Sequence, residues 1–219
     1  MINKLKKVFP FYTEYHKLNH CGMEISYLSF LKFKVFGSKT YWQSKKTCYV
    51  GMPKRLYIGK NSIVIRNNNF IQASGGIYIG NYVQFATRVS LLSANHDLYN
   101  QNISHHKSII IGDYCWLGMS SSVLAGVTLG PRTIVANGAV VTKSFPEGMC
   151  VLAGVPAKVI KRLEPDFFEP WAYKYEFYGY MPSEVFENNP EFIIKKYLDP
   201  DYFKVENGKI VPIIKDYTK

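Results

Sequence analysis

The stretch IGDYCWLGMSSSVLAGVTLGPRTIVANGAVV, residues 111–141, carries a strict repeat of six residues. A large apolar residue stands at every sixth position, and a second residue, small except in the last case, follows each of them by four. The first set is Ile111, Leu117, Val123, Leu129, Val135 and Val141, and the second is Cys115, Ser121, Val127, Thr133, Ala139 and Phe145. An α-helix repeats near 3.6 residues and an ordinary strand near 2. The period of six predicts a parallel β-helix, in which each hexapeptide forms one flat side and three form a coil. We expect the aliphatic residues to point inward, the small ones to lie near corners, and Gly112, Gly118 and Gly130 to ease the turns.

The repeat begins before this stretch. Two earlier phases are visible, with a step between them that is three residues too long near Gly75-Gly76; they are Ile58, Val64, Phe70 and then Ile79, Phe85, Leu91. The next step, from Leu91 to Ile111, exceeds one repeat by fourteen residues. The sequence therefore predicts a loop, residues 95–109, that is extruded from the coil. An insertion on an otherwise regular solenoid is often functional.

Three regions follow from this pattern. Residues 1–57 are expected to form a cap segment of mixed strands, since YLSFLKFKVF shows an imperfect alternation. Residues 58–157 are the β-helix. Residues 158–219 are aromatic and acidic, and we expect a short helix within FENNPEFIIKKYL (186–198) and packing on the open end of the solenoid, whose edge needs a cover. The predicted fold class is all-β, with a partly helical tail.

Charge and cysteine content restrict the partners and the compartment. The first 57 residues hold eleven Lys/Arg and two Asp/Glu, which suits an anionic lipid surface or an acidic glycan, and no nucleic-acid motif accompanies them. No apolar run is long enough to cross a membrane, and the N-terminus lacks the pattern of a signal peptide. The four cysteines are scattered, which favours reduced thiols and, for Cys115, a structural role. We expect a cytoplasmic protein that can meet the inner face of the membrane.

The segment 111–163 resembles the hexapeptide-repeat acyltransferases, in the branch that holds galactoside, maltose, serine, xenobiotic and surface-polysaccharide acetyltransferases. The resemblance rests on IGDYCWLG, on VVTK near the last coil and on AGVPAKVI at its end. The resemblance as a whole covers roughly residues 58–162, about half of the chain. It implies a left-handed coil, a homotrimer, and acetyl-coenzyme A bound in the groove between adjacent subunits.

The resemblance places the catalytic residue at the start of the extruded loop, in Asn95-His96-Asp97. His96 would act as the general base, with a carbonyl or carboxylate on its other ring nitrogen, and no covalent intermediate is needed. His105 and His106 in the same loop raise the alternative of a zinc site of the γ-type carbonic anhydrases. A fourth ligand and that family's spacing are missing. We therefore expect no metal, and we expect these two histidines to face the acceptor or solvent.

Further site residues are carried over from the family's motif. Trp116 is expected to face outward beside the coenzyme, and the amide after Gly118, that of Met119, to bind the thioester oxygen. Positions matching coenzyme contacts are Asn137, Gly138, Thr142, Lys143, Lys158 and Lys161, the two last as phosphate-binding cations. Candidate acceptor contacts are Asn67, Asn68, Asp97 and Arg88. The run Asn67-Asn68-Asn69 could equally be a turn signal.

These observations favour an enzyme that moves an acetyl group from acetyl-coenzyme A to a sugar hydroxyl, in a bacterial capsule or O-antigen. The aromatic flanks would suit stacking on a carbohydrate. Two related alternatives are N-acetylation of an amino sugar and acetylation of a virginiamycin-type drug. A non-enzymatic alternative is a β-helix scaffold or binding module, which would have no need for His96, Trp116 and Lys143 in one groove.

Overall fold

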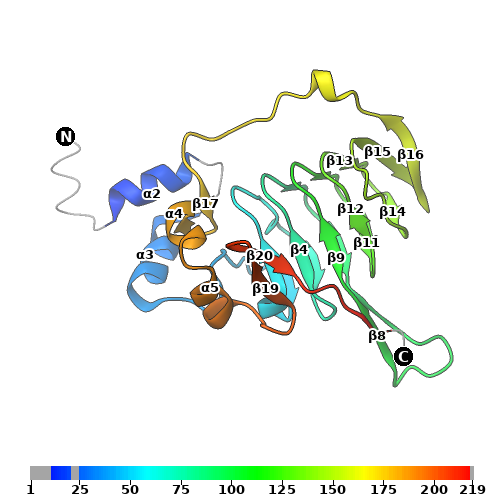
Figure 1. Ribbon diagram of the computed structural model, residues 1–219, viewed down its shortest axis with the longest axis horizontal. Coiled ribbons are helices and arrows are strands. Elements are labelled where there is room, and N and C mark those ends of the chain that lie inside the picture. The colour runs from blue at the N-terminus through cyan, green and yellow to red at the C-terminus, as the bar shows by residue number, and fades with distance from the viewer. Residues whose placement is uncertain (1–10, 21–24, 218–219) are drawn as a thin grey trace.

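The computed structural model describes residues 11–20 and 25–217, and its centre is a left-handed parallel β-helix (Figure 1). Three parallel sheets form the sides of the prism, which we call faces A, B and C. Face A consists of β1 (Tyr49–Gly51), β3 (Phe70–Gln72), β6 (Ser90–Leu92), β11 (Ser122–Leu124) and β14 (Val140–Val141). Face B consists of β2 (Leu56–Ile58), β4 (Ile77–Ile79), β9 (Ile109–Ile111) and β12 (Thr128–Leu129). Face C consists of β5 (Gln84–Phe85), β10 (Trp116–Leu117), β13 (Thr133–Val135), β15 (Cys150–Gly154) and the antiparallel β16 (Ala157–Arg162).

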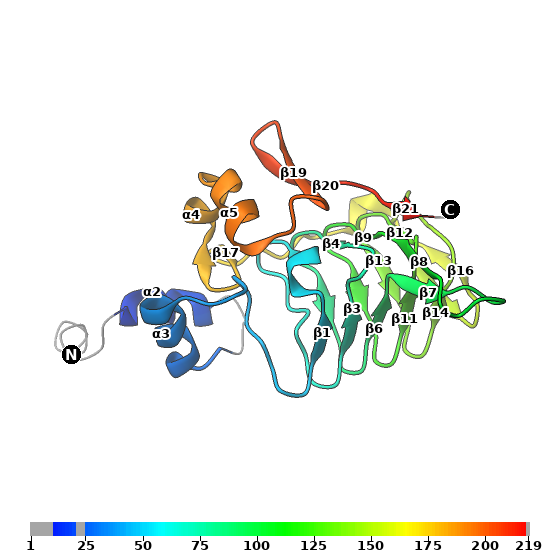
Figure 2. The same ribbon diagram turned by 90° about the horizontal axis from the view of Figure 1, so that it is seen from below.

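Each coil visits the faces in the order B, C, A, and Figure 2 shows the strands of face A side by side along the prism. The first coil includes β1, which pairs with β3, so the β-helix starts at residue 49 and not at 58. Both predicted sets of repeat residues are buried in the prism, and burial raises the pKa of the Cys115 thiol to about 12. Cys115 is therefore a packing residue, as predicted.

The prediction for Phe70 was wrong. Its side chain is 41% exposed, and its neighbour Ile71 is fully buried in its place. One residue is inserted between Val64 and Ile71, and Ile65 is also buried there. Because successive residues of a strand point to opposite sides, a shift of one residue exchanges the inner and outer positions.

The repeat glycines have a different role from the one predicted. Gly118 does not adopt a positive φ; a Cβ on it would lie 2.5 Å from the side-chain oxygen of Asn137 in the next coil. The left-handed turn positions come two residues later and are occupied mostly by other residue types, such as Ser120 and Arg132. The glycine is thus needed for close approach between coils.

The extruded loop is a β-hairpin that leaves the edge between faces A and B, which we call the A–B edge (Figure 2). Its strands are β7 (Ala94–His96) and β8 (Ser104–Lys107). A third strand, β21 (Asp216–Tyr217), pairs with β8 from the C-terminal end of the described chain. The hairpin is therefore held on one side by a segment that is distant in sequence.

The N-terminal segment is helical, which corrects the prediction of mixed strands. It contains α2 (Tyr12–Asn19), α3 (Tyr27–Phe36) and a 3-10 turn, Pro53–Arg55. The Ser26 side chain caps α3 by accepting a hydrogen bond from the amide of Ser29. The buried Phe30 packs with Leu18, Ile25, Phe177 and Tyr180 in a small second core. None of the helices in residues 11–20 and 25–217 could cross a bilayer.

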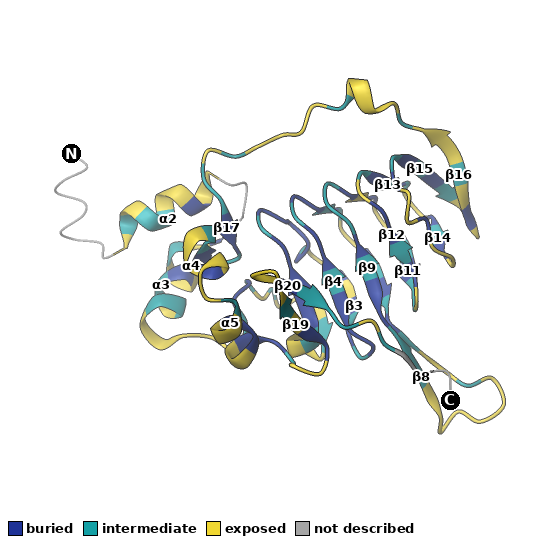
Figure 3. Ribbon diagram, viewed as in Figure 1, coloured by how far each residue is buried: buried dark blue, intermediate teal, exposed yellow. Residues whose placement is uncertain are grey.

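The C-terminal extension returns along the solenoid and covers its N-terminal end, as predicted (Figures 1 and 3). It includes a 3-10 turn (Pro165–Phe167), β17 (Phe177–Tyr178), β18 (Met181–Pro182), α4 (Ser183–Glu187), α5 (Pro190–Tyr197), β19 (Phe203–Glu206) and β20 (Lys209–Pro212). The expected helix is α5. Its Ile193 and Tyr197 are buried in the same core as Tyr41 and Leu56 of the first coil.

Aromatic residues hold the returning segment on the edge between faces B and C. Tyr82 and Tyr114 stack with ring centroids 5.0 Å apart, and Trp171 packs edge-on against Tyr114 at 6.1 Å. The Arg132 guanidinium lies 3.6 Å from the centre of the Phe168 ring. These flanking aromatics are thus used to attach the extension, and not, as predicted, to present free faces to a carbohydrate.

Candidate functional site

His96 ends strand β7 at the point where the chain leaves the coil. It is exposed, and its Nδ1 lies 2.8 Å from the backbone carbonyl oxygen of Gln101 across the hairpin. A carbonyl can only accept a hydrogen bond, so Nδ1 carries the proton in this contact. Nε2 of the neutral ring is then the basic nitrogen, and the ring is held in that tautomer.

Asp97 pairs with a different histidine. Its Oδ2 lies 3.0 Å from Nε2 of His105, and its Oδ1 accepts hydrogen bonds from the amides of Tyr99 and Asn100 at 2.9 Å each. The bond from His105 and then the two amides lower the pKa of this carboxyl to about 2. The carboxylate therefore organises the hairpin. These contacts all lie inside the loop.

Face C carries the predicted coenzyme side of the site. Its registers place the outward residues in one row: Gln84, Trp116, Ile134, Val151 and Lys161. Trp116 is 53% exposed, as expected for an outward position. Lys158 lies opposite Ala153 on the last strand pair, and both predicted lysines are exposed. The row thus runs from the exposed indole to Lys161, and the second cation, Lys158, lies on the same strand.

The edge between faces C and A is a ladder of turns stacked along the coils. The Gly138 amide donates to the Met119 carbonyl at 2.9 Å, and the Met119 amide donates to Oδ1 of Asn137 at 2.8 Å. The amide predicted to bind the thioester oxygen therefore already has a partner. Asn137, predicted to touch the coenzyme, fixes this turn through its side chain. A similar bond between coils occurs at the edge between faces B and C, where Oδ1 of Asp113 accepts from the amide of Asn81 at 2.7 Å.

The asparagine run belongs to the same ladder. Asn69 is buried, with Nδ2 donating to the Val64 carbonyl at 3.0 Å and Oδ1 accepting from the Val89 amide at 2.9 Å. Asn68 has a left-handed φ of 60°, and Asn67 Oδ1 accepts from the Thr47 hydroxyl at 3.1 Å. Of the two interpretations of this run, the turn is the one its contacts support. Arg88 lies one coil further, with its guanidinium 3.2 Å from the Met119 sulfur.

Thr142 and Lys143 lie at the A–B edge, beyond the end of β14. They are two coils past the point where the hairpin leaves, and Lys143 is exposed with its ammonium 5.7 Å from the centre of the Phe145 ring. They share an edge with His96 and not with Trp116. Gly126 lies on the same edge, one coil before Thr142 and Lys143. A Cβ there would lie 3.2 Å from the side chain of Lys107 of β8.

The predicted residues therefore fall into two groups. His96, Thr142 and Lys143 lie on the A–B edge, whereas Trp116, Gly118, Met119, Asn137, Gly138, Lys158 and Lys161 lie on face C or at its edge with face A. In a triangular prism, the A–B edge lies opposite face C. One copy of the chain cannot bring the two groups together.

A metal site does not form in the hairpin. No group of three or more His, Cys, Asp or Glu side chains within residues 11–20 and 25–217 could hold a metal ion. The hairpin histidines are used differently: His105 pairs with Asp97, and His96 faces a carbonyl.

The repeat matches a known family. Residues 108–143 match the family model of the bacterial transferase hexapeptide, six repeats. This part of the chain is similar to the hexapeptide-repeat transferases. The chain is 30% identical over 99 residues to a galactoside O-acetyltransferase of Lactococcus lactis, covering 43% of this chain and 47% of that protein. It is 29% identical over 119 residues to the galactoside O-acetyltransferase of Escherichia coli, covering 52% of this chain and 58% of that one.

These alignments leave much of this chain and much of each relative unmatched. The chain spans about half to three fifths of the length of the curated relatives it matches. A solved maltose O-acetyltransferase from Clostridium difficile shares the fold, with a TM-score of 0.51, 22% identity and coverage of 69% of this chain and 86% of that one.

Two features of the site were missed by the sequence prediction. The Gln101 carbonyl that orients His96 cannot be assigned from residue type, because any residue offers a carbonyl. The Asp97 turn had a signal, since an aspartate whose side chain accepts amides two and three residues later is a common turn former.

Proposed function

We propose that this protein transfers the acetyl group of acetyl-coenzyme A to a hydroxyl of a sugar, with His96 as general base. The observation that carries the proposal is the contact between Nδ1 of His96 and the Gln101 carbonyl, at 2.8 Å. It leaves Nε2 as the basic nitrogen on an exposed hairpin. The aligned galactoside O-acetyltransferases support a sugar as the acceptor.

The chemistry needs one proton acceptor and one bound thioester. Nε2 of His96 takes the proton of the sugar hydroxyl while the oxygen attacks the thioester carbonyl carbon. The carbon–sulfur bond then breaks, and the imidazolium returns the proton to the coenzyme thiolate. Lys158 and Lys161 are placed to hold the phosphates, as exposed cations at the end of the Trp116 row.

The active assembly is proposed to be a homotrimer. The hairpin and face C lie on opposite sides of one copy, so the hairpin of each subunit would reach face C of a neighbour. Its tip is suited to such a contact, because Leu98 is 90% and Tyr99 98% exposed. An exposed apolar tip and an exposed indole would each gain a partner.

The acceptor is proposed to be a surface polysaccharide unit met at a membrane. On α3, the exposed face combines the apolar Leu28, Val35 and Phe36 with Lys32, and Lys39 follows the helix. Apolar side chains flanked by lysines favour the surface of an anionic bilayer. Sedimentation with anionic and zwitterionic vesicles, for the wild type and Phe36→Ser, tests this part. Equal binding to both vesicle types would contradict it.

The proposed activity is tested by coenzyme binding and turnover. Acetyl-coenzyme A at 100 times its Kd should add about 2.7 kcal/mol to the free energy of unfolding. Thiol release should appear when a panel of sugars with free hydroxyl or amino groups is added. A melting temperature that does not move in millimolar acetyl-coenzyme A would rule the proposal out.

A further inference from the structure

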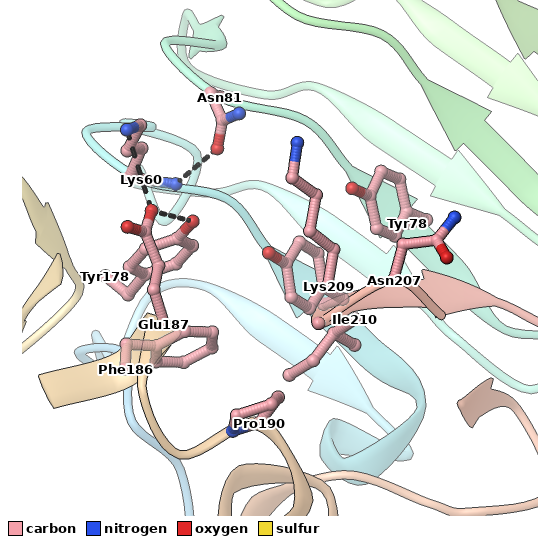
Figure 4. Close-up of a pocket in the computed structure, with 12 residues that line it drawn as sticks. Lys60, Tyr78, Asn81, Tyr178, Phe186, Glu187, Pro190, Asn207, Lys209 and Ile210 are labelled. Atoms are coloured by element: carbon pink, nitrogen blue, oxygen red, sulfur yellow. Dashed lines mark hydrogen bonds and ion pairs between the residues drawn. The ribbon is translucent and has the colours of Figure 1, made fainter. Parts of the chain in front are cut away.

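A pocket of ≈ 420 Å³ lies at the N-terminal end of the solenoid, and none of the residues predicted for the acetyl-transfer site lines it (Figure 4). Face B forms one wall, and the C-terminal extension forms the others. The lining residues are Tyr57, Lys60, Tyr78, Asn81, Tyr178, Phe186, Glu187, Pro190 and the tip of the β19–β20 hairpin, 207–210. The size falls within the roughly 300–1,000 Å³ of small-molecule sites.

One wall of the pocket is fixed by a network of one ammonium and two carboxylates, of which Lys60 and Glu187 line the pocket and Glu176 lies outside the lining. The Tyr178 hydroxyl donates to Glu187 at 2.9 Å, and the Lys60 ammonium lies 3.6 Å from the same carboxylate. Lys60 also contacts Glu176 at 2.8 Å. Burial works against the charge of Lys60, but its bonds to these two carboxylates raise its pKa overall. The ammonium of Lys60 is thus already neutralised by the protein.

The rest of the lining is rich in groups that bind hydroxyls. Burial raises the pKa of Tyr57 and of Tyr78, so both phenols stay neutral and can donate as well as accept. Their rings stack with centroids 4.6 Å apart, which fixes the positions of both. Asn81 Oδ1 accepts from the Lys60 amide at 3.0 Å, so its NH₂ group is the part that can serve a ligand.

One positive charge in the lining is not balanced. Lys209 is exposed at the start of β20, and within the described residues its ammonium makes no ion pair. In Figure 4 its side chain is drawn between those of Asn81 and Tyr78. A ligand that matches this lining is rich in hydroxyls and carries one negative charge.

We propose that the pocket binds one acidic sugar unit, a monosaccharide with a single carboxylate or phosphate, whose anion faces Lys209. The inference rests on the proposed function for its biological meaning, because a glycan acceptor would supply such a unit. The pocket lies on the first two coils of face B, whereas the His96 hairpin leaves the A–B edge after β6. The bound unit would therefore be a different residue of the glycan from the one that is acetylated.

The test is a titration of the full chain with sugar probes in the absence of coenzyme, and binding is measured by saturation-transfer NMR and by calorimetry. The probes are glucuronic acid, glucose 6-phosphate, glucose and inorganic phosphate. We expect at least one acidic sugar to bind about tenfold more tightly than glucose and than phosphate. Lys209→Gln should reduce the affinity for that sugar about tenfold, as expected for one charge-assisted contact. Tyr78→Phe should weaken the binding of acidic and neutral sugars alike, by roughly threefold.

A matched control is Lys204→Gln, an exposed lysine on β19 of the same hairpin that does not line the pocket. It should bind like the wild type. The proposal is overturned if glucose binds as well as the acidic sugars, if phosphate alone binds as tightly, or if Lys209→Gln binds like Lys204→Gln. His96→Ala should also bind the acidic sugar normally. A wild-type protein that binds acidic sugars and transfers no acetyl group would reject the proposed function and leave the pocket standing.

Discussion

The A–B edge and face C of the same solenoid differ in how closely they follow the six-residue repeat. Face C runs through four parallel strands and an antiparallel fifth with a single bulge, and its registers set Trp116 and Lys161 in one row. The A–B edge is interrupted by a hairpin, which presents His96 with an oriented ring. In the proposed mechanism, the regular side is the binding surface and the irregular side supplies the general base. A single copy holds both, facing in opposite directions.

The largest expected effect is on the hairpin side. His96→Ala should reduce turnover by about 10²–10⁴-fold, because a general base is lost, while coenzyme binding on face C remains near normal. Thiol release and a coenzyme titration measure the two quantities separately. His106→Ala is the control on the same strand pair. A greater loss in His106→Ala than in His96→Ala would move the base to that residue.

The second prediction joins the two sides across subunits. Trimers assembled from equal amounts of His96→Ala and Trp116→Ala should regain activity, because some sites receive an intact hairpin from one subunit and an intact face C from its neighbour. Random assembly makes about a quarter of the sites intact. Activity of the remixed sample would be compared with that of the two parents. No recovery, or a monomer in light scattering, would mean that the site is not shared.

A third prediction concerns the ladder beside face C. Asn69→Ala removes the side chain that bonds the Val64 carbonyl and the Val89 amide. It should therefore lower the free energy of unfolding by about 1–3 kcal/mol. Asn67→Ala, at an exposed position of the same run, should cost less than about 1 kcal/mol. Urea denaturation measures both. A stable Asn69→Ala variant that has lost sugar binding would instead favour the acceptor role for this run.

Smaller effects are expected at the end of face C. Lys158→Glu and Lys161→Glu should each weaken acetyl-coenzyme A binding by roughly fivefold to tenfold and leave the melting temperature unchanged. Calorimetry and thermal denaturation check the two parts. Lys195→Glu, on α5 far from face C, is the control. If it weakens binding equally, the effect is only one of overall charge.

The smallest expected effect is on the tip of the hairpin in mild acid. The pKa of Asp97 is lowered to about 2, so its stabilising bonds are complete above the ordinary carboxyl range and are lost only as the pH falls through about 2. The NMR signals of the Tyr99 and Asn100 amides should therefore keep their positions between pH 7 and pH 4. A shift with a midpoint near pH 4 would show that the carboxylate is not held in this way.

The sequence predicts the solenoid well because its core is periodic. Leu117 and Val123 need no knowledge of the rest of the chain, since a period of six fixes which side they face. The prediction fails where one residue breaks the period, as at Phe70, because the pattern alone does not say on which side of the insertion the phase changes.

Helix α3 shows a second limit. The segment YLSFLKFKVF is apolar at seven of its ten positions, so it fits an alternating strand and a helix almost equally. Its helical form depends on the Ser26 cap and on Phe30, which packs against Phe177 and Tyr180. These partners come from residues far along the chain, which a local pattern does not reveal.

For the candidate site, the structure adds the arrangement of the predicted residues, while their roles stay predictions. His96 and Trp116 were expected in a groove between subunits, and the coil order shows that they lie on opposite sides of one copy. Met119 was expected to have a free amide, and the Asn137 side chain of the next coil takes it. A bond between coils depends on three-dimensional stacking, which the residue types alone leave open.

The returning extension ties the folding of the first coil to the synthesis of a much later segment. The residues that cover the first coil are made after the last one, and the ion pair between Arg55 and Asp199 closes a loop of 144 residues. Coils can form and stack as they leave the ribosome, whereas the first coil keeps an open strand edge until its cover arrives. A nascent chain that stops after β16 would thus display an unpaired apolar end, a surface for chaperones or for self-association.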